Sequence, residues 1–98
     1  MTLTTHTERM LSRLRELLPV TEDEIVQRGI AAEVTARIVE LRRAAAQLSA
    51  RYTSVEALEA RVRAEGVSPD DHTLYTDLLE WRAVRHEMTE LTGFLQAV

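Results

Sequence analysis

The stretch from Ile30 to Val55, IAAEVTARIVELRRAAAQLSARYTSV, decides the fold of this 98-residue chain. Its apolar residues recur at intervals of three and four, which is the spacing of one face of an α-helix. This first row consists of Ile30, Val34, Ile38, Leu41, Ala45, Leu48, Tyr52 and Val55. A second row has the same spacing and consists of Leu74, Leu78, Trp81, Val84, Met88, Leu91, Leu95 and Val98. The two rows predict two long amphipathic helices.

Residues that typically begin and end helices predict two shorter helices as well. Three threonines are each followed three residues later by a glutamate, which is the pattern of a capping box. These threonines are Thr5, Thr21 and Thr53. Pro19 and Gly66 are placed to end helices, and Ser68 with Pro69 is a typical helix start. The predicted helices are 6–18, 22–51, 54–65 and 69–96.

Gly29 leaves two alternatives for the second helix. It either ends a short helix or lies inside a continuous one, at a cost of about 1 kcal/mol relative to Ala. We favour the continuous helix, because Val26, Ile30 and Val34 keep their apolar spacing across the glycine.

These elements predict an all-α fold, an antiparallel helical bundle in a single domain over 1–98. The third helix is too short to run along the whole second helix, so one long helix keeps an uncovered apolar row. A second copy of the chain is a ready source of cover, which predicts a coiled-coil-like homodimer or a larger homo-oligomer.

Composition excludes several classes of function. The chain has no Cys, which excludes disulfides and thiolate metal sites, and all twelve of its basic residues are Arg, which excludes lysine chemistry. A net charge of −4 argues against general binding to nucleic acid. We expect a cytoplasmic protein, because neither a signal peptide nor an apolar segment of membrane-spanning length is evident.

The polar residues suggest no catalytic chemistry. His86 and Glu90 resemble part of a zinc-protease helix, but a second His is missing, so we expect a solvent-exposed face. Carboxylates at Asp70 and Asp71, beside His72, are explained by their stabilising effect in the first turn of a helix. We therefore expect no enzyme activity, no metal and no cofactor.

The arginines are mostly balanced by nearby carboxylates. Glu33 with Arg37 and Glu59 with Arg63 have the four-residue spacing of ion pairs along an exposed helix. The segment with three arginines near the start of the chain is the one part considered for nucleic acid, and a solvated face explains it better. These residues are Arg9, Arg13 and Arg15.

The fourth predicted helix carries the candidate binding surface for a protein partner. Trp81 is either a core residue or an interface anchor, since Trp and Arg are enriched among binding hot spots. The apolar end beyond Gly93 packs either on the first helix or on another chain. The candidate interface residues are Trp81, Arg85, Met88, Leu91, Phe94 and Leu95.

The segment from Arg51 to Leu91 resembles small helical antitoxins of prokaryotic toxin–antitoxin pairs. The resemblance is carried by Arg51-Tyr52, by the helix start TSVEALE at 53–59 and by DLLEW at 77–81. It covers less than half of the chain and implies a protein that neutralises a toxin, often a nuclease, by wrapping helices over it.

Three hypotheses follow from the sequence. The first is a non-enzymatic protein-binding module, with an antitoxin as its most concrete form. The second is a homo-oligomeric scaffold whose dimer core is formed by Ile38, Leu41, Ala45 and Leu48. The third is a small helical enzyme with a site between subunits. The enzyme would require convergent inward polar groups, and Arg85 is the one candidate.

Overall fold

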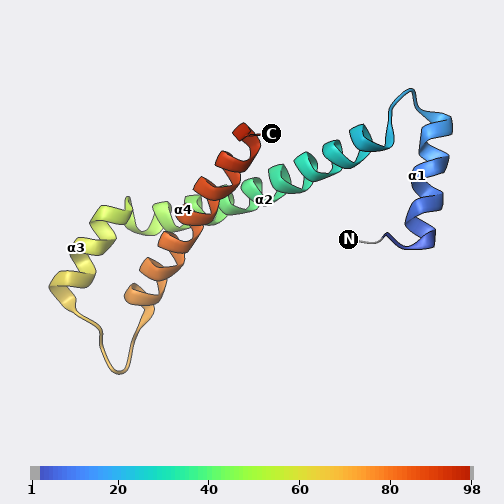
Figure 1. The fold of residues 1–98 in the computed structure, drawn as a ribbon. Helices are drawn as coiled ribbons and strands as arrows, with labels where there is room; N and C mark the ends of the chain where they lie inside the picture. Colours follow the sequence, from blue (N-terminus) through green and yellow to red (C-terminus); the bar gives the residue numbers. More distant parts are fainter. Residues whose placement is uncertain (1–2, 98) are drawn as a thin grey trace. The chain divides into compact units, whose positions relative to one another are not determined.

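The chain is helical throughout its regular structure (Figure 1). The computed structural model describes residues 3–97, and within this range it contains four helices and no strand. The helices are α1 (Thr5–Leu17), α2 (Glu22–Tyr52), α3 (Val55–Glu65) and α4 (Thr73–Ala97). The all-α class and the number of helices are thus confirmed. Val98, the last residue of the second apolar row, lies outside the described residues.

The chain divides into two compact units, Met1–Val34 and Thr35–Val98. The single domain expected from the sequence stays a prediction.

The first unit contains α1 and the beginning of α2. The predicted cap at Thr5 is wrong by one residue, because the hydroxyl of Thr4 accepts the backbone N–H of Thr7 at 3.1 Å. The cap at Thr21 is confirmed, since its hydroxyl accepts the N–H of Glu24 at 3.1 Å. Helix α1 ends just before Pro19, which fixes its own φ and cannot donate a backbone hydrogen bond. No side chain between residues 3 and 34 is buried.

The long helix is continuous through Gly29, as predicted from the apolar spacing. Helix α2 has 31 residues, and nothing lies within 4 Å of the position that a Cβ atom would occupy at Gly29.

The second unit begins with the end of α2 and the turn into α3. Thr53 was predicted to cap α3, but this is wrong by one residue. Thr53 has a positive φ of 75° and donates its N–H to the carbonyl of Ser49, so it ends α2 instead. Ser54 then takes the cap position in extended backbone, and its hydroxyl accepts the N–H of Ala57 at 3.0 Å.

The loop between α3 and α4 is longer than predicted. Gly66 ends α3 with a φ of 71°, and its N–H donates to the carbonyl of Val62 at 2.8 Å. The predicted start of α4 at residue 69 is wrong, and the helix begins at Thr73. The Ser68 hydroxyl accepts the N–H of Asp70, two residues ahead, and forms a local turn in place of a helix cap. A second such turn, from the Asp71 carboxylate to the Thr73 N–H at 2.9 Å, leads directly into α4.

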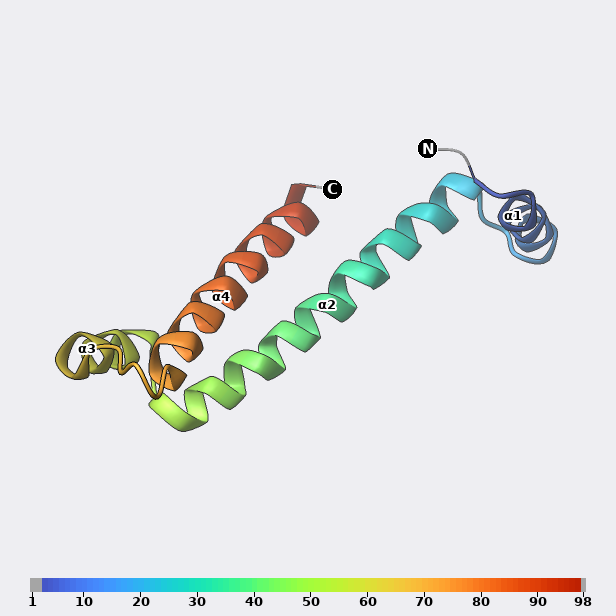
Figure 2. The ribbon, with the colours of Figure 1, turned by 90° about the horizontal axis from the view of Figure 1, so that it is seen from below.

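Helices α2, α3 and α4 meet at one apolar core in the second unit. Residues 35–52 of α2 run antiparallel to α4 (Figure 2). Ion pairs join Arg37 to Glu87 and Arg51 to Asp77. The central cluster lies where α3 joins this pair, and Leu58 is its most deeply buried member, with no exposed surface. The cluster consists of Leu48, Val55, Leu58, Leu78 and Trp81. The side chains of Ile38, Leu41 and Val84 are also buried.

Helix α3 covers only part of α4. It runs antiparallel to α4, with Glu56 close to Arg85 (3.6 Å) and Glu59 close to Arg82 (3.2 Å). Since 11 residues span about 16 Å and 25 residues about 37 Å, α3 reaches along less than half of α4. The part of α4 after Arg85 extends beyond the start of α3.

Candidate protein-binding surfaces

A buried carboxylate joins the end of α2 to the start of α4. The Asp77 side chain is 10% exposed, and its Oδ2 atom accepts hydrogen bonds from the Tyr52 hydroxyl (2.5 Å) and from Arg51 (3.3 Å). The hydrogen bond to Asp77, followed by burial, raises the pKa of Tyr52 above its ordinary value. No buried side-chain nitrogen or oxygen within residues 3–97 lacks a hydrogen-bond partner, so we interpret this cluster as a structural contact. This contact was not predicted from the sequence, because Asp77 lies between two apolar positions of α4, Leu74 and Leu78.

The predicted interface residues of α4 separate into two groups. Trp81 is 6% exposed and belongs to the chain's own core, which is one of its two predicted alternatives. Arg85 is exposed and forms an ion pair with Glu56. Its guanidinium therefore faces α3 and not a convergent polar site of the kind that an enzyme needs.

The remaining four residues lie beyond the reach of α3. Met88, Leu91 and Leu95 are half-buried and continue the face of Trp81 at intervals of three and four. Phe94 is 45% exposed and points about 100° away from Leu95 around the helix. The structure thus brings three of the four onto one face, with Phe94 at its edge. Their role in binding a partner stays a prediction.

A shallow hollow of about 430 Å³ lies along this part of α4. It is lined by Met88, Thr89, Thr92, Gly93 and Gln96. Most of these side chains are small, which leaves room for another helix to approach closely.

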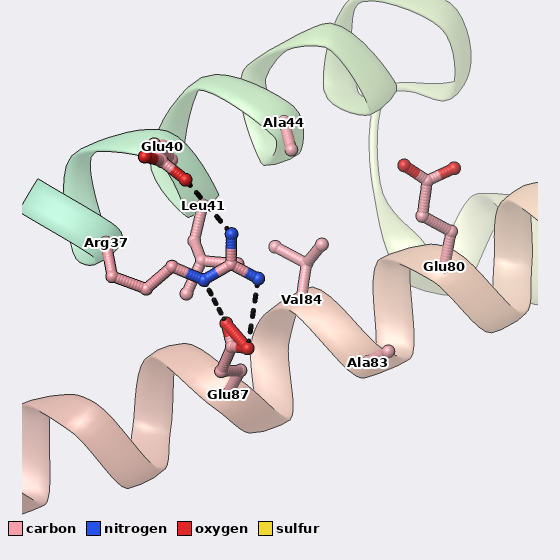
Figure 3. Close-up of a pocket in the computed structure, with 8 residues that line it drawn as sticks. All are labelled: Arg37, Glu40, Leu41, Ala44, Glu80, Ala83, Val84 and Glu87. Carbon is pink, nitrogen blue, oxygen red and sulfur yellow. Dashed lines mark hydrogen bonds and ion pairs between the residues drawn. The ribbon is translucent and has the colours of Figure 1, made fainter.

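A second hollow lies between α2 and α4 and is closed at one end by a network of charges (Figure 3). Arg37 binds both carboxylate oxygens of Glu87, at 2.8 and 3.1 Å, and also contacts Glu40 at 3.0 Å. These hydrogen bonds raise the pKa of Arg37 and lower that of Glu87. Leu41 and Val84 point between the helices, and the volume is about 330 Å³.

Neither of two ion pairs predicted along single helices forms; Arg37 and Glu59 each have a partner on α4, and Arg37 also binds Glu40 of its own helix. Arg37 binds Glu87 and Glu40 instead of the predicted Glu33, and Glu59 binds Arg82 instead of the predicted Arg63. The four-residue spacing considers only partners on the same helix. Helix α4 offers other carboxylate and guanidinium partners. For Arg37, binding both carboxylate oxygens of Glu87 is stronger than a contact with a single oxygen.

In the first unit, most of the large apolar side chains of α1 are exposed, and Leu11 is half-buried. The exposed ones have exposed fractions of 36–62%, which is unusual for residues that repeat every three or four positions. This α1 stripe consists of Met10, Leu14 and Leu17 of the helix, together with Leu3 before it and Leu18 at its C-cap. Charged residues occupy the remainder of the helix, with Arg13 bound to Glu16 at 2.9 Å and Arg15 to Glu22 at 3.3 Å.

The described residues do not gather groups that would bind a metal ion. In residues 3–97, no set of three or more His, Asp or Glu side chains is arranged to hold one. His86 and Glu90 approach to 3.9 Å and are 78% and 69% exposed, which agrees with the solvent-exposed face predicted for them. The pKa of Asp71 is lowered by its hydrogen bonds to Thr73 in the turn before α4.

Comparison with protein-family models, with curated proteins and with solved structures finds no match to this chain. None of the helices in residues 3–97 is both long and apolar enough to cross a membrane.

Proposed function

We propose that this chain is a non-enzymatic protein-binding module and that the part of α4 after Arg85 carries its binding surface. One observation supports the proposal most directly. The apolar face of α4 continues after Val84, beyond Glu56 at the start of α3 and beyond the ion pair of Arg37 with Glu87 that joins α4 to α2. Met88, Leu91 and Leu95 therefore remain half-exposed on a face whose earlier residues are buried.

The energetics favour a helical partner on this surface. Full burial of a Leu or Met side chain contributes about 1.5–3 kcal/mol relative to an exposed one. Three half-buried residues together with Phe94 can thus supply several kcal/mol. The hollow beside Thr92 and Gly93 would admit the backbone of an approaching helix. This arrangement resembles the helix-in-groove mode of recognition, with anchors at intervals of three and four residues.

The test compares native mass spectra of the tagged chain, purified from its own source, with those of three variants. Leu91→Asp and Leu95→Asp place a charge in the proposed surface and are expected to remove a stoichiometric partner while helicity stays unchanged. His86→Asp adds the same charge on the exposed face of the same helix, and is expected to keep the partner. Retention of the partner by all three variants would refute the assignment of this surface.

A toxin-neutralising role is the narrower form of this proposal. It is supported by the sequence resemblance of residues 51–91 alone. Several of the residues that carry this resemblance also have internal roles, since Arg51 and Tyr52 bind Asp77 and Trp81 lies in the core. A co-purified nuclease whose activity is restored when it is separated from the chain would support the antitoxin form.

A homo-oligomeric scaffold is the second candidate, on a different surface from the one predicted. Ile38, Leu41, Ala45 and Leu48 were predicted to form a dimer core, but Ala45 is half-buried and the other three are at most 7% exposed within the single chain. They are covered by the chain's own helices, so they cannot also serve as a dimer core in this arrangement. The uncovered stripe of α1 is the surface that favours self-association.

A further inference from the structure

We propose that Thr53 and Ser54 form a hinge, and that through this hinge the chain exchanges its α3–α4 pair, residues 55–97, with a second copy. In the exchanged dimer α2 and α3 of each copy join into one helix, and α4 of one copy packs on α2 of the other. The inference is independent of the binding surface proposed for the end of α4. It rests on the backbone of the turn between α2 and α3 and on the sequence around that turn.

The backbone at Thr53 is strained. Its φ is 75°, and the N–H of Ser54 donates to the carbonyl of Tyr52, two residues earlier, at 2.9 Å. This combination is that of a γ-turn with a positive φ, which is rare and strained. A β-branched side chain adds to the strain, because its Cβ atom lies close to the following carbonyl oxygen. Within residues 3–97, Thr53 is the only non-glycine residue with a positive φ, so opening this turn releases strain.

The sequence allows α2 and α3 to continue as one helix. The chain contains neither Gly nor Pro from Ile30 to Glu65, so only the turn at Thr53 separates the two helices. Thr and Ser are weak helix formers but are tolerated inside helices. The apolar row of α2 also continues into α3 at intervals of three and four. Across the junction this row consists of Leu48, Tyr52, Val55, Leu58 and Val62.

A continuous helix cannot keep the apolar core within one chain. In the closed form Leu48 of α2 packs in one cluster with Leu58 of α3 and with Leu78 and Trp81 of α4. In a continuous helix Leu48 and Leu58 are about 15 Å apart along the helix axis. The α3–α4 pair then loses the contacts of its own α2, and its apolar residues require another helix in that place.

A second copy is selected because its α2 carries the same residues in the same register. Exchange of an identical element needs no new complementary surface, and a short, strained hinge favours it. The contacts between α3 and α4 stay within each chain. The contacts that pass between copies are those of Leu48 in the cluster, of Arg37 with Glu87, and of Arg51 and Tyr52 with Asp77.

The first test uses an ion pair that the exchange places between copies. Arg37→Glu and Glu87→Arg each bring like charges together, in the closed chain and in a homodimer alike. When the two variants are refolded together, opposite charges meet at both positions only if α2 of one variant lies on α4 of the other. At about 1 mM protein, the effective concentration of two segments joined by a short linker, the ratio of heterodimer to homodimers should exceed the statistical value about tenfold. Native mass spectrometry measures this ratio.

A matched control uses an ion pair that the exchange leaves within the chain. Arg61 and Glu65 both lie on α3 and approach to 2.6 Å. A mixture of Arg61→Glu and Glu65→Arg should therefore give the statistical ratio.

The second test changes the hinge itself and measures the dimer Kd by sedimentation equilibrium. The Ser54 hydroxyl caps α3 only in the closed form, so Ser54→Ala should lower the Kd about thirtyfold, because each dimer contains two hinges. Thr53→Gly accepts the positive φ and weakens the continuous helix, so it should raise the Kd about thirtyfold or more. Ala50→Gly weakens α2 equally in both forms and should leave the Kd unchanged.

Fluorescence of Trp81 reports whether the core remains folded in each variant. A statistical ratio in the mixture of Arg37→Glu with Glu87→Arg would overturn the proposal, because a dimer without exchange gives the same result. Shifts of the Kd in the same direction for Ser54→Ala and Thr53→Gly would also overturn it. So would a Ser54→Ala variant that has a folded core and is monomeric at every concentration reached.

Discussion

The hydrogen bond between Tyr52 and Asp77 offers a sharp test of the core of the second unit. Replacing Tyr52 by Phe removes only the hydroxyl and leaves Asp77, 10% exposed, with Arg51 as its remaining partner. A hydrogen bond to a charged group contributes about 1.5–3 kcal/mol. Because Arg51 is 59% exposed and can follow the carboxylate, we expect the lower half of this range, a loss of about 1.5–2 kcal/mol.

The assay is urea unfolding followed by tryptophan fluorescence. Trp81 is the only Trp of the chain and lies in the cluster against which Tyr52 packs, so its signal follows this unit. The chain also provides a matched control, because its other tyrosine, Tyr75, is 41% exposed. Tyr75→Phe should change the free energy of unfolding by less than about 0.5 kcal/mol.

The same hydrogen bond predicts a dependence on pH. The pKa of Tyr52 is raised in the folded chain, so folding favours the protonated hydroxyl. The stabilisation is fully present below the unfolded pKa of about 10 and is lost as the pH rises through the higher folded value. The unmodified chain should thus lose more stability above pH 10 than Tyr52→Phe does.

A double-mutant cycle gives the result that would refute this reasoning. Asp77→Ala should cost less in the Tyr52→Phe background than in the unmodified chain, because the hydrogen bond is already absent. Additive losses, or an equal loss in Tyr75→Phe, would mean that the contact contributes nothing specific.

Two further predictions concern the backbone between the helices. Gly66→Ala should destabilise the chain by about 1–3 kcal/mol in thermal unfolding, since the φ of 71° and ψ of −170° at Gly66 are accessible essentially to glycine alone. Gly93→Ala lies inside α4 with open space around it and should stabilise the chain by up to about 1 kcal/mol. Equal effects of the two substitutions would contradict this backbone conformation at Gly66. Ser54→Ala should cost about 1 kcal/mol through loss of the α3 cap, and Thr53→Gly should stabilise the chain by relieving a positive φ. If Thr53 were the cap, as the capping-box pattern predicts, Thr53→Ala would carry the cap cost in chemical denaturation and Ser54→Ala would not.

The helices could be predicted from the sequence because their apolar spacing is redundant. Continuity through Gly29 was predictable for this reason, since one glycine costs about 1 kcal/mol and the residues on either side keep the same face. The ends were predicted less well, because a cap depends on which of two adjacent hydroxyl residues takes the extended backbone. At 4–5 and at 53–54 two such residues stand side by side, and each time the neighbour of the predicted one is the cap.

Contacts between helices were beyond sequence reasoning. Glu33 and Arg37 have good spacing for a pair on one helix, yet Arg37 binds Glu87, fifty residues away. Asp77 is a polar residue at a position on the apolar face of α4. Its partner Tyr52 was placed in the apolar row of α2, so its hydroxyl was not considered as a hydrogen-bond donor. Pairing across helices depends on the register of α2 against α4, which the spacing within each helix does not contain.

The exposure of α4 after Arg85 depends on the residues at which α3 begins and ends. Its start is set by Ser54, which follows directly on the end of α2, and its end by Gly66, where the positive φ breaks the helix. Because α3 runs antiparallel to α4, its first turn is what lies nearest Arg85. A longer α3 would extend from Gly66 towards the loop before α4, and would still not reach Met88. The part of α4 that α3 leaves uncovered is therefore a consequence of the order of the helices and not of the length of α3 alone.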